Sequence, residues 1–419
     1  MHNCSSSSTR SGPFARLPES GYTVYVTPRA TARLWPSILA AAFATSVVAM
    51  RPTKTTRVAI RTAPTELAEQ LALDTWSEHR APGMPIDIVV DASALSRLSV
   101  RGIAWEVLVP DVDAAAEAEE LRLASPQPAN ADWFAEYKDY AAISEYIATL
   151  AKLAPERVSL HGIGTSIDGR TIWALRIGSG AKPMLINGTQ HAREWIAAMT
   201  TTCVADRLVR DYDRDPKVRE FVDSTTLWVV PVVNPDGYQY SWSSSRYWRK
   251  NRRGGYGVDL NRNWGVAFGG PGSSGSKRSD IYRGEYAFSE PESAAVRDLA
   301  QRVRPKLAID FHSYGQLVLY PWNYTSKRAD DHDQLTAVGD KMASAIYAQH
   351  QQRYTLMSGV ELYPAAGTAQ DFMYGDIGAL AYTIELRPKG RGGFVLPPSE
   401  IRPTCDEGLA AVLALRAAP

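Results

Sequence analysis

Three residues of the chain, His191, Glu194 and His312, have the side chains and the spacing of metal ligands. His191 and Glu194 lie three residues apart, after an apolar run at 184–186 and a turn-like stretch at 187–190. His312 follows a second apolar run much further along the chain. A catalytic zinc ion typically has three protein ligands and one position left for water. These residues therefore predict such a site, although a His-x-x-Glu pair alone also suits a solvated helix start.

The surroundings of these residues favour the metal site. Both histidines follow predicted core strands, and the active sites of open α/β sheets form where such strands end. A zinc-bound imidazole also needs an acceptor for its other ring nitrogen. Asp259, which lies in a polar loop, is the candidate acceptor for His191.

Glu385 is a single carboxylate within an apolar strand predicted at 380–386. A buried strand rarely carries a glutamate unless the residue is paired or used. Glu385 is therefore a candidate base beside the metal. The structural alternative is an ion pair with Arg387, which lies two residues on and on the same side of the strand.

Arginine and asparagine residues cluster at 248–252 and 259–264, in a Gly- and Arg-rich loop region predicted at 234–283. A guanidinium can grip a carboxylate with two hydrogen bonds, so this cluster suits an anionic substrate group. The alternatives are a solvated basic loop or an anchor for nucleic acid. The interspersed aromatic residues disfavour simple solvation, and a formal net charge of +1 gives no indication of a nucleic-acid partner.

The composition is that of a soluble globular protein, with 45% hydrophobic and 22% charged residues among 419. Three cysteines, Cys4, Cys203 and Cys405, exclude a disulfide scaffold. If Cys4 is removed with a leader, at most one disulfide can form, between Cys203 and Cys405. Both cysteines fall in apolar helical patterns, so we expect core residues there rather than a bridge.

The first 51 residues have the features of a leader with a signal peptide. Arg29 and Arg33 precede an apolar run at 34–50 that contains small-residue cleavage patterns. The export signal at 29–50 predicts a secreted or periplasmic protein. An uncleaved membrane anchor is the alternative, although the run is short and rich in alanine for a membrane span.

The remaining chain divides into three parts. Residues 52–122 alternate strands and helices, as expected for a small two-layer domain, and residues 123–131 form a Pro/Ser/Asn-rich linker. Within the small domain we predict strands around 58–60, 86–90 and 103–108 and helices at 66–77 and 114–121. Residues 132–419 form one large α/β domain. Its predicted strands lie at 157–161, 171–177, 183–187, 226–232, 306–311, 316–320 and 380–386, and its predicted helices at 140–153, 194–211, 289–302, 332–349 and 399–416.

Several short motifs follow one another in this large domain. They are His191-Ala-Arg-Glu-Trp195, Pro231-Val-Val-Asn-Pro-Asp-Gly-Tyr238, Trp248-Arg-Lys-Asn-Arg252, Asp259-Leu-Asn-Arg-Asn-Trp264, His312-Ser-Tyr-Gly-Gln-Leu317, Tyr363-Pro-Ala-Ala-Gly367 and Glu385-Leu-Arg387. In order and spacing the chain resembles the zinc metallocarboxypeptidases of the pancreatic carboxypeptidase A and B group. Residues 52–122 resemble the pro-domain of that family by position and pattern.

The resemblance implies a fold and a reaction. The fold is a mixed, twisted central β-sheet flanked by helices, preceded by an open α/β sandwich that acts as an inhibitory pro-domain. The reaction is hydrolysis of the C-terminal peptide bond of peptides and proteins by a monomeric enzyme with one Zn²⁺. The implied roles are zinc binding by His191, Glu194 and His312, general base catalysis by Glu385, oxyanion stabilisation by Arg252, binding of the terminal carboxylate by Asn261, Arg262 and Tyr363, and contact with upstream peptide residues by Arg193.

The chain departs from the family at the pocket for the released side chain. Gln370 takes the place of an apolar residue in the A-type enzymes and of an acidic one in the B-type. An uncharged amide favours release of neutral residues. Other residues expected around this pocket are Leu319, Asn323, Ser358, Leu362, Thr368 and Thr383.

Three further features follow from the resemblance. The family commonly has a cis peptide bond after the Arg of Glu-Leu-Arg, and here the next residue is Pro388, so we predict a cis Arg387–Pro388 bond. The loop disulfide of the pancreatic enzymes is missing at 253–257. The linker holds no dibasic pair, although a trypsin-like activating protease could cut at Arg122-Leu123.

Two other functions compete with a carboxypeptidase. One is a hydrolase of small amides, such as an N-acyl amino acid or a cell-wall peptide. The other is a binding protein that keeps the fold without activity. The presence of all three ligands, of Glu385 and Arg252, and of the complete carboxylate clamp disfavours both.

Overall fold

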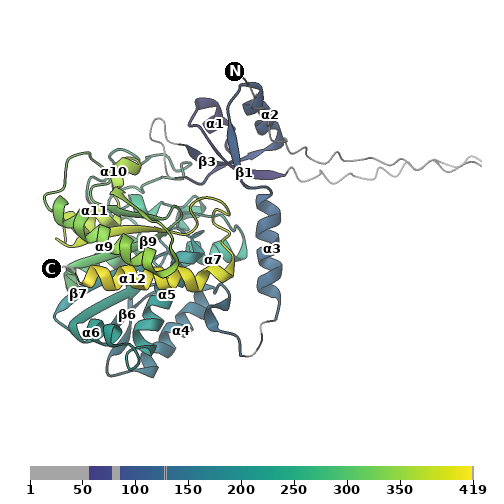
Figure 1. The fold of residues 1–419 in the computed structure, drawn as a ribbon. Helices are drawn as coiled ribbons and strands as arrows, with labels where there is room; N and C mark the ends of the chain where they lie inside the picture. The colour runs from purple at the N-terminus through teal and green to yellow at the C-terminus, as the bar shows by residue number, and fades with distance from the viewer. Residues whose placement is uncertain (1–55, 78–84, 127, 129, 418–419) are drawn as a thin grey trace, which may run out of the picture. The chain divides into compact units, whose positions relative to one another are not determined.

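The structure is a computed structural model that describes residues 56–77, 85–126, 128 and 130–417. The predicted leader and signal peptide, with Cys4, lie outside these residues. Figure 1 shows the order of the elements along the chain.

The N-terminal domain is a four-stranded sheet in the order β2-β3-β1-β4 with helices beside it. Its strands are β1 (Arg57–Thr62), β2 (Asp74–Thr75), β3 (Ile86–Asp91) and β4 (Trp105–Val109), and its helices are α1 (Glu66–Leu71), α2 (Ala92–Val100) and α3 (Val112–Ala124). The small α/β domain predicted from the sequence is therefore confirmed. The helix predicted at 66–77 ends early, at Leu71, because the chain turns there into β2. The sequence pattern also missed α2, which starts directly after β3 on an Asp91 cap.

The second domain contains a mixed eight-stranded sheet in the order β11-β10-β12-β9-β7-β8-β6-β5. Its four central strands, β12, β9, β7 and β8, are parallel, and antiparallel pairing flanks them on both sides. This arrangement confirms the predicted mixed central sheet. The strands are β5 (Val158–Thr165), β6 (Thr171–Ile177), β7 (Lys182–Gly188), β8 (Thr225–Val230), β9 (Leu307–Ser313), β10 (Leu317–Tyr320), β11 (Thr355–Ser358) and β12 (Leu380–Leu386).

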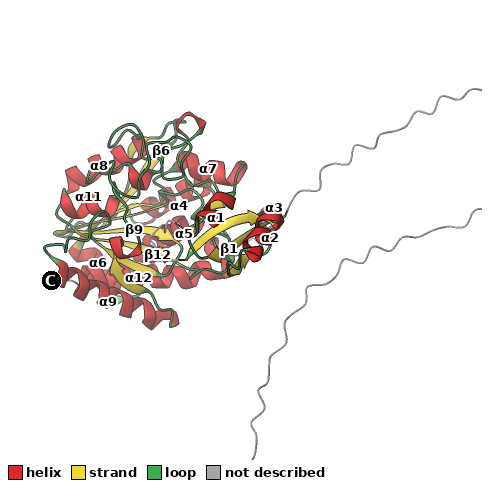
Figure 2. Ribbon diagram, turned by 90° about the horizontal axis from the view of Figure 1, so that it is seen from above, coloured by secondary structure: helices red, strands yellow, loops and turns green. Residues whose placement is uncertain are grey.

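Helices cover both faces of this sheet, and each face has its own apolar core. One core joins the sheet to α4 (Tyr140–Leu153), α5 (Trp195–Arg210), α6 (Pro216–Ser224), α9 (His332–His350) and α12 (Ile401–Arg416). The other joins it to α8 (Pro291–Val303) and α11 (Ala369–Gly375). Figure 2 shows α8 and α11 on one side of the strands and α6, α9 and α12 on the other. Burial on both faces explains why the parallel strands are nearly continuous apolar runs.

Short elements lie within segments that the sequence pattern left as loops. They are α7 (Pro235–Ser243) and α10 (Gly359–Leu362), with 3-10 turns at Trp133–Ala135, Arg253–Gly255 and Leu260–Arg262. A further 3-10 turn, Pro398–Glu400, takes up the start of the helix predicted at 399–416. Asn234 caps α7 through its side chain, which accepts from Gly237 N. Such short helices have too few turns to show a 3.6-residue period, so propensity and periodicity do not reveal them.

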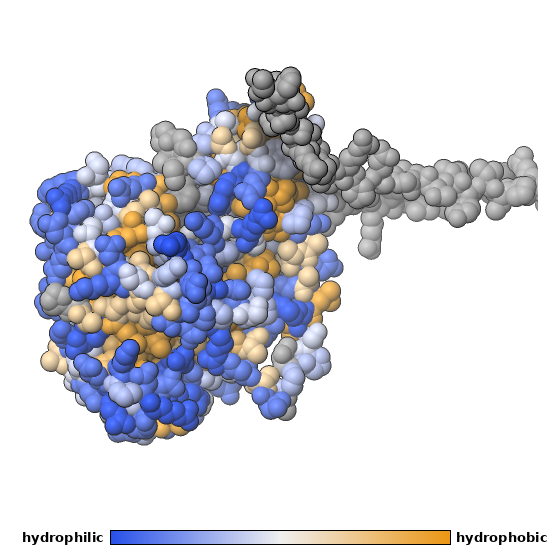
Figure 3. Space-filling view, viewed as in Figure 1, coloured by the Kyte–Doolittle hydropathy of each residue, from blue (hydrophilic) through white to orange (hydrophobic). Residues whose placement is uncertain are grey.

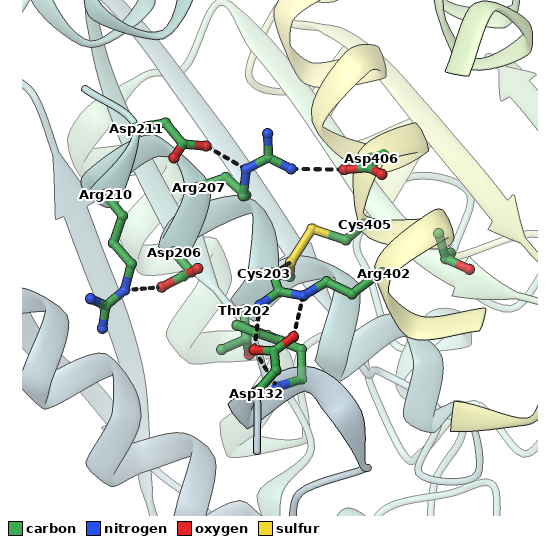
Figure 4. Close-up of a disulfide and its surroundings, with 12 residues drawn as sticks. Asp132, Thr202, Cys203, Asp206, Arg207, Arg210, Asp211, Arg402, Cys405 and Asp406 are labelled. Carbon is green, nitrogen blue, oxygen red and sulfur yellow. Dashed lines mark hydrogen bonds and ion pairs between the residues drawn. A yellow bond between two sulfur atoms is a disulfide. The ribbon is translucent and has the colours of Figure 1, made fainter. Parts of the chain in front are cut away.

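Cys203 and Cys405 form a disulfide between α5 and α12, contrary to the prediction of two separate core residues. Both cysteines are fully buried, so the prediction of a core position was correct and only the pairing was missed. The two helices pack together over the sheet, which brings the cysteines within reach although 202 residues separate them in sequence. Figure 4 shows the bridge beside the Arg207–Asp406 and Arg402–Asp132 ion pairs.

The bond between Arg387 and Pro388 is cis, as predicted. None of the helices among the described residues is long and apolar enough to cross a membrane. On the face drawn in Figure 3, hydrophilic side chains predominate and smaller apolar areas lie between them.

Candidate metal centre

His191, Glu194 and His312 converge, although they come from three different elements. His191 lies in the turn after β7, Glu194 directly precedes α5, and His312 lies near the end of β9. Because β7 and β9 are parallel neighbours, their carboxyl ends meet at one edge of the sheet. One ligand atom from each of the three residues lies within 4.8 Å of the others, and all three side chains are buried.

The geometry around these side chains suits a metal ion. The Nδ1 atoms of the two histidines face each other at 3.1 Å, and Glu194 carboxylate oxygens lie 2.8 Å from His191 Nδ1 and 3.1 Å from His312 Nδ1. The opposite ring nitrogens face carboxylates: His191 Nε2 lies 3.2 Å from Asp259, and His312 Nε2 lies 2.8 Å from Asp310. Hydrogen bonds of this kind hold the proton on Nε2 and leave the Nδ1 lone pair toward the centre. Two imidazoles and one carboxylate are an established donor set for catalytic zinc.

The charges around the centre favour ionised carboxylates. Burial alone would raise the pKa of Glu194, but the neighbouring imidazoles of His191 and His312 outweigh it and lower that pKa to about 2. Burial also acts to raise the pKa of Asp259, and Arg249 and Arg262 outweigh it and lower that pKa. Asp259 is fixed further by a 2.9 Å hydrogen bond from Arg249.

Glu385 lies beside the metal ligands because β12 pairs with β9. In this parallel register Glu385 is the partner of His312. Arg387 does not form the predicted alternative pair with it, because its guanidinium binds Glu407 and Glu400 instead. Glu385 is thus placed at the centre by the sheet.

Arg252 lies between two aromatic rings. Its guanidinium carbon is 3.6 Å from the centroid of Tyr240 and 4.6 Å from that of Trp248. Within the described part of the chain, its buried Nη1 atom has no hydrogen-bond partner. A buried cationic donor without an acceptor is costly, so this atom suits an anionic group supplied by a substrate.

Asn261 and Arg262 lie in a 3-10 turn close to the ligands. Asn261 Nδ2 is 3.5 Å from His312 Nε2, and Asn261 Oδ1 accepts from Ala369 N at 2.9 Å. Arg262 is held by Gly272 O and by Asn261 O, both at 2.8 Å, and its Nη2 lies 3.5 Å from the hydroxyl of Tyr363. The predicted clamp residues are therefore neighbours in space.

Gln370 lies at the start of α11 and is buried beneath this group. Its side chain contacts Asn323, Thr383 and Leu319. The Leu319, Leu362, Tyr363 and Ala365 side chains form a small apolar cluster of their own. Ser358 lies on the adjacent strand β11, where it pairs with Tyr320, and its hydroxyl bonds Glu361 at the start of α10.

A cavity of about 290 Å³ opens beside Glu194, Tyr363 and Glu385. The N-terminal domain supplies part of its wall through residues including Arg61, Trp76 and Asp87. Asp87 accepts a hydrogen bond from Tyr314 across the cavity at 2.8 Å.

The side chain of Arg193 contacts both domains. It donates to Thr75 O at 3.1 Å and stacks on Phe394 with 4.3 Å between guanidinium carbon and ring centroid.

Two residues behind the ligands were not predicted from the sequence. Asp310 contacts His312, and Arg249 holds Asp259, which contacts His191. Asp310 lies two residues before His312 on the same strand, so both side chains point to one face. A carboxylate and a histidine at that spacing in an otherwise apolar strand were a usable signal. Arg249 carries no comparable signal, because its link to Asp259 depends on how two loops meet.

Comparisons with known proteins agree with this geometry. A model of the zinc carboxypeptidase family matches residues 143–411. Carboxypeptidase A4 of Mus musculus is 34% identical over 358 residues, which are 81% of this chain and 85% of the relative. Carboxypeptidase B of Astacus astacus is 39% identical over 297 residues, 67% of this chain and 96% of the relative.

A solved structure described as thrombin activatable fibrinolysis inhibitor is similar over 86% of this chain and 98% of its own, with a TM-score of 0.79 and 31% identity. The similarity therefore extends over both domains, and the residues at the metal centre lie within the matched family region. The chain belongs to the zinc carboxypeptidase family, and it is a metallocarboxypeptidase, a zinc-dependent peptide hydrolase.

Proposed function

We propose that this enzyme releases single neutral residues from the C-termini of peptides and proteins, with Glu385 as its general base. The observation that best supports this assignment is the strand register that places Glu385 beside His312. A general base must lie within hydrogen-bond reach of the proton that it removes. Glu385 takes a proton from the attacking water and later delivers it to the leaving amine.

His191, Glu194 and His312 hold the zinc ion, and Asp259 and Asp310 orient the two histidines. When bound, zinc lowers the pKa of its water ligand to about 7, which supplies a nucleophile near neutral pH. Arg252 binds the negative charge that develops on the oxygen of the scissile carbonyl. Its unpartnered Nη1 atom supports this role.

Asn261, Arg262 and Tyr363 bind the terminal carboxylate of the substrate. This clamp explains an exopeptidase, because an internal peptide bond offers no terminal charge to a buried arginine. Gln370 lies at the end of the pocket for the released side chain and favours neutral residues there. Arg193 contacts residues further up the peptide once the N-terminal domain has left.

The N-terminal domain, predicted at 52–122, acts as a pro-domain that limits access to the site. Its contacts with Arg193 and Tyr314 and its share of the cavity wall support this role. Cleavage by an activating protease in the 123–131 segment separates it from the 132–419 catalytic domain. The observed α3 continues to Ala124, so the proposed site Arg122-Leu123 lies in the last turn of a helix.

The enzyme acts as a secreted or periplasmic monomer. The buried Cys203–Cys405 disulfide supports an oxidising compartment, because structural disulfides persist outside the reducing cytosol. An export signal at 29–50 would deliver the chain there.

The test uses purified protein with and without limited proteolysis, and peptides that differ only in their last residue. Mass spectrometry should show loss of one residue from peptides with neutral C-termini. The Glu385→Gln variant should bind one zinc ion per chain and lose nearly all activity. Retained turnover in that variant would exclude Glu385 as the base, while inactivity of the wild type on every free-acid peptide would overturn the function.

A further inference from the structure

A network of buried amide groups lies at the start of α11, against Thr383 of β12. Asn323 Nδ2 lies 2.9 Å from Gln370 Oε1, 2.9 Å from Asp371 Oδ1 and 3.2 Å from Thr368 Oγ1. The Gln370 oxygen accepts a second hydrogen bond, from Thr383 Oγ1 at 3.0 Å. These bonds determine which end of each amide is nitrogen and which is oxygen.

Asn323 presents its nitrogen to the carboxylate of Asp371, so its oxygen points away from that group. Gln370 uses its oxygen for two donors and one N–H for Leu319 O, at 3.0 Å. An amide nitrogen carries two N–H donors, and an amide oxygen can accept. In the described part of the chain, no partner is seen for the second N–H of Gln370 or for Asn323 Oδ1. One donor and one acceptor therefore remain at this end of the pocket.

The strand geometry places Thr383, which contacts this pair, about one side-chain length from Glu385. Thr383 and Glu385 lie on the same face of β12, opposite Leu319 and Leu317 of β10. Two residues of a strand span about 6.8 Å. Between these levels the wall is apolar, through Leu319, Leu362 and Ala365. A side chain that fills this space needs an apolar stem and a polar end.

The polar end must also be neutral. Asp371 is fully buried, and its oxygens already accept hydrogen bonds from Asn323 N at 3.0 Å, so it is not an exposed partner for a basic side chain. Burial raises the pKa of Asp371 to about 7, because its surroundings disfavour a charged group, and the same surroundings disfavour a charged substrate end. Basic and acidic residues are both poor occupants of this space.

We propose that the pocket recognises a side-chain carboxamide, so that the enzyme prefers C-terminal glutamine or asparagine. The free N–H of Gln370 donates to the carbonyl of the substrate amide, and Asn323 Oδ1 accepts from its NH₂ group. This inference rests on the proposed function and narrows its class of neutral residues. It makes Asn323 a specificity-determining residue together with Gln370.

The experiment measures kcat/KM of the proteolytically activated full-length protein on free-acid peptides that end in Gln, Asn, Met, Leu, Glu or Lys. A pocket that hydrogen-bonds its ligand discriminates against isosteres that lack the polar group. Peptides ending in Gln or Asn should exceed those ending in Met or Leu by about 10- to 100-fold. Peptides ending in Glu or Lys should be slower still.

Two variants test the residues involved. In Asn323→Ala and in Gln370→Met, the ratio of kcat/KM for the Gln peptide over the Met peptide should fall close to 1. Gln349→Met, a matched change on the exposed side of α9, should leave that ratio as in the wild type. Thermal unfolding shows whether each variant is folded. The wild-type ranking of the peptides tests the preference for Gln and Asn even if a variant does not fold.

Equal or faster release of Met or Leu by an active wild-type enzyme would overturn the inference, as would a preference for Glu or Lys. Either result would leave the proposed carboxypeptidase function standing. A wild type that shortens none of the free-acid peptides would instead overturn the proposed function itself.

Discussion

At the scale of single residues, Arg252 offers a buried hydrogen-bond donor to a substrate at the metal centre. Its guanidinium lies between two aromatic rings and keeps a buried Nη1 donor without a partner in the described structure. Removing such a donor from a site of developing charge typically costs about 3–4 kcal/mol. Arg252→Gln should therefore lower kcat by about 100- to 1,000-fold with little change in KM, as measured by steady-state kinetics.

The exposed Arg278 provides a control for that experiment, since Arg278→Gln removes the same charge from a loop residue that is not part of the proposed site. This control should keep wild-type kinetics. An Arg252→Gln enzyme with unchanged kcat would exclude the oxyanion role.

Glu292 gives a second prediction at this scale, because one of its oxygens is buried without a partner in the described structure. Burial raises its pKa from 4.5 to about 7. The folded state thus binds a proton more tightly than the unfolded state between these values, so this group lowers stability as pH rises through that window. Glu292→Gln should remove the effect and keep an acceptor for Asn251.

Chemical denaturation of both proteins at pH 5 and pH 8 measures this. The free energy of unfolding of Glu292→Gln, relative to wild type, should rise by about 1–3 kcal/mol between the two pH values. A difference that does not change with pH would contradict the burial argument.

At the scale of elements, the large sheet and the helices α5 and α12 position the residues of the site. The pairing of β9 with β7 and β12 brings His191, His312 and Glu385 together, and α5 begins directly after Glu194. The α5 helix is tied to α12 by the Cys203–Cys405 bridge. This bridge therefore anchors the helix that follows a metal ligand.

Loss of this bridge should reduce stability strongly. The 202-residue separation of the cysteines means that the bridge restricts much of the unfolded chain, and a loop of that size predicts a loss of about 5 kcal/mol. The Cys203→Ala/Cys405→Ala double variant should lower the midpoint of urea unfolding accordingly. Urea unfolding of both proteins with and without reductant provides the control. Reductant should lower the unfolding midpoint of the wild type and leave that of the variant unchanged. Identical wild-type midpoints under both conditions would show that the bridge does not contribute.

Much of this arrangement could be predicted from the sequence. Periodicity located α4 at 140–153 and α5 to within a residue at each end, and it identified the central strands, because long buried elements have clear patterns. The link from Asp259 to His191 was also predicted and is observed. The short helices α2 and α11 and the Cys203–Cys405 pairing were not predictable in this way. Each depends on a local cap or on tertiary packing rather than on a repeat of apolar residues.

At the scale of the whole molecule, the N-terminal domain and the catalytic domain share the wall of the cavity beside Glu385. Glu119 of α3 also forms a buried ion pair with Arg246, and Tyr247 donates to Val112 O at 2.9 Å. Peptide substrates must compete with these contacts. Activity should therefore rise at least about tenfold when the N-terminal domain is cut off, which is the effect of removing about 1.4 kcal/mol of competing interaction.

Limited trypsin digestion followed by a peptide assay measures this rise. In the Arg122→Gln variant, trypsin should no longer release the domain at that position, and the rise should be delayed or lost. An uncut protein as active as the cut one would contradict the pro-domain role.

The central claim is that a clamp for the terminal carboxylate directs a zinc-dependent peptidase to the last peptide bond. The most direct measurement compares two copies of one peptide with a neutral last residue, one ending in a free acid and the other in an amide. The activated enzyme should shorten the free acid at least about 1,000-fold faster, because only the free acid offers a negative charge to the buried Arg262. Equal rates on the two peptides, or cleavage at internal bonds, would contradict the account.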